Sequence, residues 1–211
     1  MSAFKDHILR VGLILAGFAI GATSLVVLTE DQTHDQIIDN ERQTLLNAIN
    51  AVIPDGQYDN EILTDTLILG SNKQLGTKEV STVYRARKND EPVAVVLTAI
   101  APNGYNGKIK LLLGIKYDGH LTGVRVIQHK ETPGLGDKID LKKADWILNF
   151  TGLSLSNPDE SRWTVKKDGG DFDQFTGATI TPRAVVSAVK NALLYFDTHR
   201  DELFAETEAK K

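Results

Sequence analysis

The chain opens with one long apolar stretch before its pattern becomes periodic. Residues 11–29, VGLILAGFAIGATSLVVLT, contain no charged side chain and come close to the roughly 20 residues that a helix needs to cross a bilayer. Lys5 and Arg10 precede this stretch, and Glu30 and Asp31 follow it. By the positive-inside rule, this asymmetry predicts a transmembrane helix with a cytoplasmic N-terminus and a translocated C-terminal domain.

A cleaved signal peptide is the alternative explanation of the same stretch, because the flanks and small residues would suit one. We expect an uncleaved anchor, since the apolar run is long and no small-x-small cleavage pattern stands clearly at its end. The expected localisation is a bacterial inner membrane, crossed once, with residues 1–10 in the cytoplasm and the main domain in the periplasm.

Beyond the anchor, a helical period gives way to a strand period. Residues 30–80 are expected to form a helical and irregular lead-in, with a helix at Asp35–Asn50 and a short strand at Thr66–Leu69. From Ser81, runs rich in β-branched and apolar residues are separated by short turn clusters; they are residues 81–88, 92–100, 108–117 and 121–130.

Short turns between successive strands favour an antiparallel meander, because parallel neighbours need long crossovers. Asp118-Gly119 is a strong hairpin signal within it. A helix at Leu141–Phe150 and a short strand at Trp163–Lys166 are expected to follow. The predicted fold class is α+β: an N-terminal transmembrane helix, then one domain at 81–200 with a twisted antiparallel sheet covered by helices, and a polar tail at 201–211.

The last periodic segment is predicted to be an amphipathic helix, and the residues at its start carry N-terminal helix signals. Its apolar face would be formed by Val185, Val186, Val189, Ala192, Leu193 and Phe196. Thr181 suits the N-cap and Pro182 the first helical position. The unpaired N–H groups and the positive end of the dipole would then face the turn TGAT, residues 176–179, which makes this turn a natural anion site.

Within that turn, Gly177 and Ala178 would let a ligand approach the backbone closely, and Thr179 carries the hydroxyl nearest the helix entrance. The same features also fit a common helix start without any ligand, with a Gly-Ala turn before Thr-Pro. Local physics alone therefore leaves both interpretations open.

Composition limits the chemistry. With 211 residues, 41% hydrophobic and 25% charged, the chain can bury one ordinary core, and its net charge of −4 without a basic, aromatic stripe disfavours nucleic-acid binding. The absence of cysteine excludes disulfides, a thiol nucleophile and cysteine-ligated zinc or iron–sulfur clusters. The five histidines lack metal-ligand spacing, and His129 is expected to have a structural or surface role. Redox chemistry here would require an organic cofactor.

Residues 173–179, DQFTGAT, match the signature at which a flavin transferase attaches FMN to threonine through a phosphoester. More widely, residues 101–183 resemble the G subunits of the Rnf or Rsx electron-transport complexes, which are related to the C subunit of the sodium-pumping NADH:quinone oxidoreductase. With the anchor, the resemblance spans most of the chain, and it is weakest at 31–78 and after Arg200.

The resemblance implies Thr179 as the FMN acceptor. It implies Asp173 as the acid that engages the transferase or its divalent metal, although a hydrogen-bonded turn aspartate is the alternative. Three glycine-bearing loops could converge on the site: 103–107 with Tyr105 at its tip, 131–136 (ETPGLG), and 166–170. In the family, the second loop lines the flavin. A lysine of the third loop near the ring could favour its reduced anion, whereas an exposed lysine pair is usually only solvated surface. The candidate FMN-binding residues are Thr179, Asp173, Thr176, Gly177, Ala178, Thr181, Glu131, Thr132, Leu135 and Lys166.

The expected function is a membrane-anchored flavoprotein subunit of an Rnf/Rsx-type complex, together with other membrane and iron–sulfur or flavin subunits. Its FMN would be attached by a flavin transferase, and the complex would move ions or keep a redox-sensing regulator reduced. No general base, GxGxxG or Walker loop is visible, which favours an electron-transfer subunit over a free-standing enzyme. The alternatives are a non-redox periplasmic interaction module, in which TGAT only caps a helix, and a soluble enzyme with noncovalent FMN.

Overall fold

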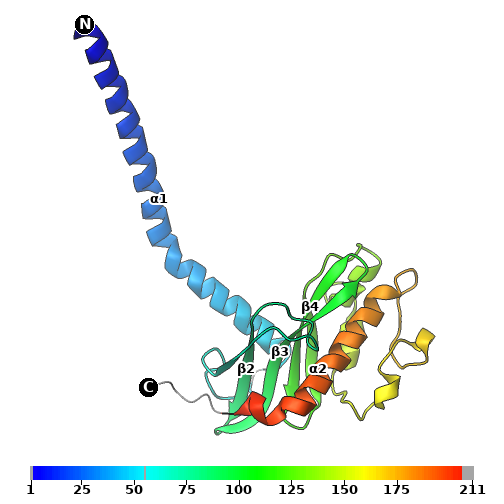
Figure 1. Cartoon of the computed structure of the whole chain (residues 1–211). Helices are drawn as coiled ribbons and strands as arrows, with labels where there is room; N and C mark the ends of the chain where they lie inside the picture. The colour runs from blue at the N-terminus through cyan, green and yellow to red at the C-terminus, as the bar shows by residue number, and fades with distance from the viewer. Residues whose placement is uncertain (1, 55, 206–211) are drawn as a thin grey trace. The chain divides into compact units, whose positions relative to one another are not determined.

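The computed structural model describes residues 2–54 and 56–205. Its internal contacts divide the chain into a unit at Met1–Leu45 and a unit at Leu46–Lys211. The first unit consists of most of one helix, and the second holds a sheet with its covering helix (Figure 1).

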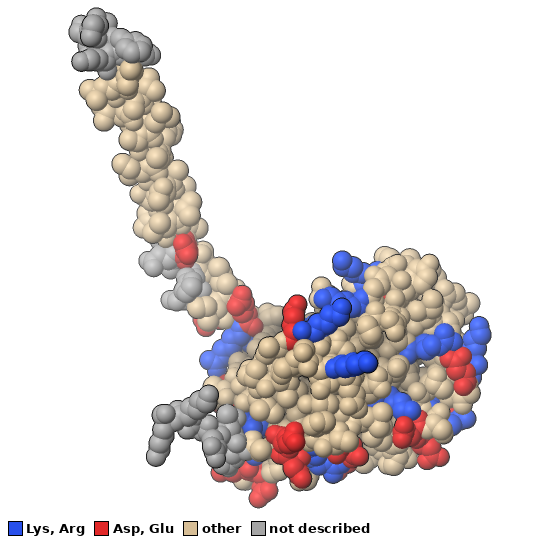
Figure 2. Space-filling model, in the orientation of Figure 1, with Lys and Arg blue, Asp and Glu red and all other residues tan. Residues whose placement is uncertain are grey.

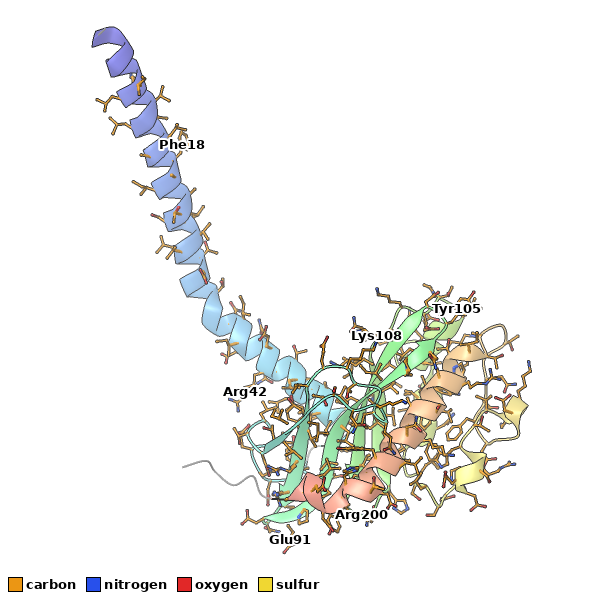
Figure 3. The ribbon with its side chains drawn as sticks, viewed as in Figure 1. Phe18, Arg42, Glu91, Tyr105, Lys108 and Arg200 are labelled. Atoms are coloured by element: carbon orange, nitrogen blue, oxygen red, sulfur yellow. The ribbon has the colours of Figure 1, made fainter. Side chains whose placement is uncertain are left out.

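Helix α1 runs from Ser2 to Asn50. The helices predicted at 11–29 and 35–50 are parts of this one element, because the residues between them include no proline or glycine to interrupt it. Within α1, the segment Ile8–Glu30 has a mean hydropathy of 2.3 and is long and apolar enough to cross a membrane. Its apolar side chains are exposed, as Phe18 illustrates (Figure 3).

The second unit is built on a five-stranded sheet in the order β1-β2-β3-β4-β5, with every neighbouring pair antiparallel. This arrangement confirms the predicted meander and the α+β class. The hairpin predicted at Asp118-Gly119 joins β4 to β5, with Gly119 at a φ of 90°. The strands are β1 (Thr66–Leu69), β2 (Ser81–Lys88), β3 (Glu91–Gly104), β4 (Gly107–Lys116) and β5 (Leu121–Gln128).

Helix α2, Ile180–Phe204, covers one face of this sheet (Figure 1). The face of α2 predicted to be apolar is buried in full, and it shares the main core with the inward residues of β3 and β4. Burial of these aliphatic side chains is the main source of stability, at about 25 cal/mol per Å² of apolar surface. Fully buried members of this core include Val95, Leu97, Leu111, Leu113, Val185 and Val189.

The opposite face of the sheet receives the end of α1 and the residues after it. Ile49, Val52 and Ile53 are completely buried. Gly114 and Gly123 pair across β4 and β5, and a Cβ atom on Gly114 would lie 2.7 Å from the Val52 carbonyl oxygen. The two glycines therefore leave the room in which the chain after α1 lies against the sheet.

Two predicted elements are wrong. Leu141–Phe150 is not an α-helix: turns lead into a 3₁₀ helix, η2, at Asp145–Phe150. Asp140 Oδ1 accepts the Lys142 N–H at 3.0 Å, a local bond that competes with helix formation. Trp163–Lys166 is not a strand either, because short 3₁₀ turns on both sides of it leave only an isolated bridge, Val165 to Phe172.

Candidate functional site

The TGAT motif begins with a tight turn. The Ala178 N–H donates to the Phe175 carbonyl at 3.0 Å, and Gly177 has a φ of +81° at the third turn position. A positive φ there is the signature of a type II turn and favours glycine. Thr176 and Gly177 are exposed at its tip, so the turn presents its backbone to solvent.

The start of α2 lies two residues earlier than predicted. The helix begins at Ile180, and Thr179 occupies the N-cap position with helical angles, φ −74° and ψ −29°. Because of these angles, the Thr179 side chain makes no capping hydrogen bond to the helix. The half-buried Thr179 hydroxyl therefore stands at the positive end of a 25-residue helix without the usual task of a cap residue.

Thr181 was predicted as the N-cap but is a buried residue of the first helical turn, 0% exposed. Its hydroxyl donates to Glu131 Oε2. The other oxygen, Glu131 Oε1, accepts the Asn106 N–H at 3.0 Å. Glu131, itself only 5% exposed, thus joins the first two glycine loops to the start of α2. Both of its carboxylate oxygens accept hydrogen bonds from the protein, so buried Glu131 stabilises the arrangement of these segments.

The ETPGLG loop lies against the TGAT turn as predicted. A Cβ atom on Gly177 would lie 3.6 Å from Leu135 Cδ2, so these two loops are in van der Waals reach. Leu135 is nevertheless 43% exposed and offers an apolar surface beside Gly177. Thr132 Oγ1 accepts a bond from Asn106 Nδ2 at 3.0 Å, which ties this loop to the β3–β4 turn.

Asp173 and Lys166 form an ion pair on the surface, with Lys166 Nζ 2.6 Å from Asp173 Oδ1 and both side chains more than half exposed. An exposed pair of this kind contributes little to stability, up to about 1 kcal/mol. The backbone of Asp173 is held more firmly, because its carbonyl accepts the Trp146 Nε1–H at 2.8 Å. Trp146 also packs edge-on against Phe175, at 5.3 Å between ring centroids.

The third loop, residues 166–170, is joined to α2 by Asp168 and Arg183. Arg183 Nε donates to Asp168 Oδ2 at 2.6 Å and Arg183 Nη2 to Asp168 Oδ1 at 2.9 Å. This bidentate bond lowers the pKa of Asp168 below its ordinary value. All three glycine loops therefore meet at the start of α2, as expected, although Tyr105 at the tip of the first loop is 66% exposed.

A cleft of about 390 Å³ runs along a flank of α2 between the β1–β2 loop and the end of β3. None of the candidate residues lines it, although Ile180 and Arg183 of the first helical turn do. Among the candidate residues, Glu131 and Thr181 are buried, and the others are half-buried or exposed.

Two residues that hold the candidate site residues in place were not identified from the sequence. Asn106 bonds to both Glu131 and Thr132, and Trp146 holds the Asp173 carbonyl. An asparagine inside the turn NGYNG was a detectable signal, because asparagine often bonds to nearby backbone. The contact of Trp146 spans 27 residues along the chain and had no local signal.

Comparison with known proteins covers both units of the chain. The family model of the FMN-binding domain matches residues 104–194, and the model of the RnfG N-terminal region matches residues 1–52. The G subunit of the ion-translocating oxidoreductase complex of Pseudoalteromonas atlantica is 50% identical over 201 residues, covering 95% of this chain and 94% of the relative. This chain belongs to the family of G subunits of ion-translocating oxidoreductase complexes.

Other G subunits agree closely with this assignment. Those of Vibrio atlanticus and Shewanella oneidensis are 49% and 47% identical, over 95% and 96% of this chain and 96% and 95% of theirs. The crystal structure of Shewanella oneidensis NqrC is similar with a TM-score of 0.46 and 21% identity, over 69% of this chain and 74% of that one.

Membership of the G-subunit family confirms the expected family and the expected FMN-binding domain. All the candidate residues lie within the matched FMN-binding domain. The RnfG N-terminal region contains the apolar segment Ile8–Glu30, consistent with a single-pass anchor in an inner-membrane complex. As one component of an electron-transport complex, the chain works together with other subunits.

Proposed function

We propose that this chain carries FMN covalently, through a phosphoester to the Thr179 hydroxyl, and relays electrons between neighbouring carriers of its complex. FMN, when bound, supplies reversible electron transfer that no side chain of this cysteine-free sequence can provide. The role of the protein is then to hold, orient and expose the flavin.

The observation that carries the proposal is the state of Thr179. It occupies the N-cap position of α2, yet its side chain caps nothing. A phosphate esterified there would lie at the first turn of the helix, where free N–H groups and the helix dipole favour an anion. The preceding type II turn, with Gly177 exposed, leaves the approach to Thr179 open.

The surrounding residues fit a flavin attached at this point. Leu135 presents an exposed apolar side chain for a flat ring, and Glu131 with Thr181 holds the ETPGLG loop against the helix. Lys166 is close to the motif, and its ion pair with Asp173 is solvent-exposed and therefore easily opened. Exposed Asp173 remains accessible to the flavin transferase that we expect to attach FMN.

A tether suits the expected location of the domain. A periplasmic protein would lose a weakly bound cofactor to the surrounding volume by mass action, whereas a covalent bond keeps it at high local concentration. With Thr176 and Gly177 exposed beside Thr179, a tethered flavin can present its edge to donors and acceptors. We infer from the charges on either side of Ile8–Glu30 that the N-terminus is cytoplasmic.

The test is mass spectrometry of the full chain, coexpressed with a flavin transferase and purified from membranes. We expect an added mass of one FMN less one water, because esterification of the hydroxyl releases the elements of water overall. Proteolysis after Lys167 and Arg183 should place this mass on the peptide 168–183 and, within it, on Thr179.

Thr179→Val should abolish the added mass, while Thr176→Ser, a matched change in the same turn, should retain it. Denaturing electrophoresis gives a second reading, because a covalent flavin stays fluorescent in the protein band and a noncovalent one is released. Flavin that survives Thr179→Val, or a colourless chain made in the presence of an active transferase, would refute the proposal.

A further inference from the structure

The sheet face opposite α2 carries a cluster of cations near the tip of the β3–β4 hairpin. Along β4, Lys108, Lys110 and Leu112 alternate with residues buried in the main core and so point to the opposite face. Arg125 of β5 is paired with Leu112 and therefore points the same way. We call Lys108, Lys110 and Arg125 the basic face.

The neighbouring strand segments contain nothing that would neutralise these cations. Residues 98–114 and 121–128 include no aspartate or glutamate. The basic face therefore opposes the overall sign of a chain whose net charge is −4. Figure 2 shows blue side chains gathered at the edge of the domain beside this hairpin, and Figure 3 labels Lys108 and Tyr105 there.

Arg125 is the most informative member. It is half-buried, and burial lowers the pKa of its guanidinium. Arg125 Nη1 donates to the adjacent Val124 carbonyl at 2.8 Å, and among the described residues no carboxylate forms a salt bridge with it. A partly desolvated guanidinium without a counter-charge is unfavourable, and its planar fork is suited to a bidentate bond with a carboxylate.

The location of the basic face favours a partner close to the candidate flavin site. Val52 covers Gly114 and Gly123 farther along the same sheet face, while Ile127, beside the cations, is 48% exposed. Asn106, in the turn next to Lys108, bonds to the ETPGLG loop. The basic face and the candidate flavin loops therefore share one end of the domain.

We propose that the basic face docks an acidic surface of a neighbouring protein of the complex. Carboxylates of the partner would pair with Arg125 and Lys110, and Ile127 would add apolar contact at the centre of the interface. Such charge complementarity fixes orientation and speeds association. An anionic membrane surface is less suitable, because interfacial binding requires several apolar side chains to insert, and Ile127 is the single large, exposed apolar residue on these β4 and β5 positions.

The experiment uses the full chain, expressed with its complex in membranes and captured through a tag on another protein of the complex. Lys108→Glu with Lys110→Glu reverses the charge at exposed Lys108 and half-buried Lys110 without altering Arg125. We expect the retained amount of this chain to fall on the order of tenfold in low salt, since one decade corresponds to about 1.4 kcal/mol of binding. Wild-type retention should also decrease as salt rises.

Lys142→Glu with Lys143→Glu is the matched control, because it changes the net charge equally at two exposed positions of a loop outside the sheet. This control should be retained like the wild type. Arg125→Gln gives a second test, with reduced retention expected, and thermal unfolding confirms that each variant is folded.

Equal retention of the reversed variant and the control would overturn the proposal. The proposal would also be overturned if the reversed variant were retained normally in the complex but no longer bound anionic phospholipid vesicles. That result would assign the basic face to a membrane. The proposal does not require flavin: Thr179→Val should be retained like the wild type, so docking and flavin attachment can fail separately.

Discussion

At the scale of single residues, Glu131 decides how the candidate site is held. Its two carboxylate oxygens accept bonds from Asn106 and Thr181, and it lies almost completely out of solvent. A buried carboxylate that loses a donor keeps its desolvation cost without the compensating bond. The integrity of the site therefore depends on a residue that we expected to bind FMN.

Thr181→Val tests this dependence. Valine has nearly the same shape as threonine but leaves Glu131 Oε2 without its donor, so we expect a loss of about 1–3 kcal/mol in the free energy of unfolding. Thr181→Ser keeps the hydroxyl and removes one methyl group, at a cost of about 1 kcal/mol. Urea unfolding of both variants measures the difference, and equal losses would show that the bond contributes little.

Asp118 makes a pH-dependent contribution to the β4–β5 hairpin. The His120 N–H donates to Asp118 Oδ1 at 3.0 Å, and this bond is the main cause that lowers the pKa of Asp118 below 3.8. Because the folded-state pKa is depressed, the contribution is complete above the unfolded pKa and is lost as pH falls through the folded one.

Asp118→Asn should therefore reduce the loss of stability as pH falls below about 5, since asparagine keeps an acceptor oxygen but cannot titrate there. Denaturant unfolding at several pH values measures this slope. Asp118→Ala provides the comparison, because it removes the acceptor at every pH. An unchanged acid slope in Asp118→Asn would contradict the assignment.

At the scale of elements, the contact between the end of α1 and the sheet depends on the absence of side chains. Gly114→Ala would place a Cβ atom 2.1 Å from Thr122 Oγ1 and 2.7 Å from the Val52 carbonyl oxygen, so the chain after α1 must shift. We expect a loss of about 1–3 kcal/mol from this overpacking.

Gly70→Ala is the matched control, because a Cβ atom there meets nothing within 4 Å. Its stability should stay within about 0.5 kcal/mol of the wild type. Thermal unfolding of both variants checks the prediction. If Gly114→Ala were equally harmless, the segment after α1 would not be tightly packed.

At the scale of the whole molecule, the helix that carries the candidate membrane-spanning segment also supplies part of the core of the second unit. The division of contacts lies at Leu45 and Leu46, inside α1, and fully buried Ile49 belongs to the second unit. Residues of the lead-in at 30–80 also contribute β1 to the sheet. The flavin-binding part of the chain is therefore stabilised by sequence well before Ser81.

Truncation measures this contribution. A chain that begins at Leu46 should fold, whereas one that begins at Tyr58 loses Ile49, Val52 and Ile53, all 0% exposed. Loss of a single buried aliphatic side chain costs about 2–5 kcal/mol, and domains are stable by only about 5–15 kcal/mol. We expect the shorter chain to be largely unfolded by circular dichroism and amide exchange. Similar stability of the two chains would show that this second core is dispensable.

Local patterns in the sequence were sufficient for the elements. Alternation and short turns determined the meander, a helical period determined the buried face of α2, and charge-free length determined the candidate span. These features depend on neighbours a few residues apart. The motif DQFTGAT pointed to Thr179 only through its match to a known attachment signature, and it lies within the matched FMN-binding domain.

Only the tertiary structure decided how those pieces meet. The bond from Thr181 to Glu131 joins residues 50 positions apart, and Thr181 lies in the first helical turn and not at the predicted N-cap. The observed N-cap residue is Thr179, and its side chain makes no capping hydrogen bond. Contacts at this separation depend on the packing of α2 against the sheet, because local periodicity carries no information about which loops that packing brings together.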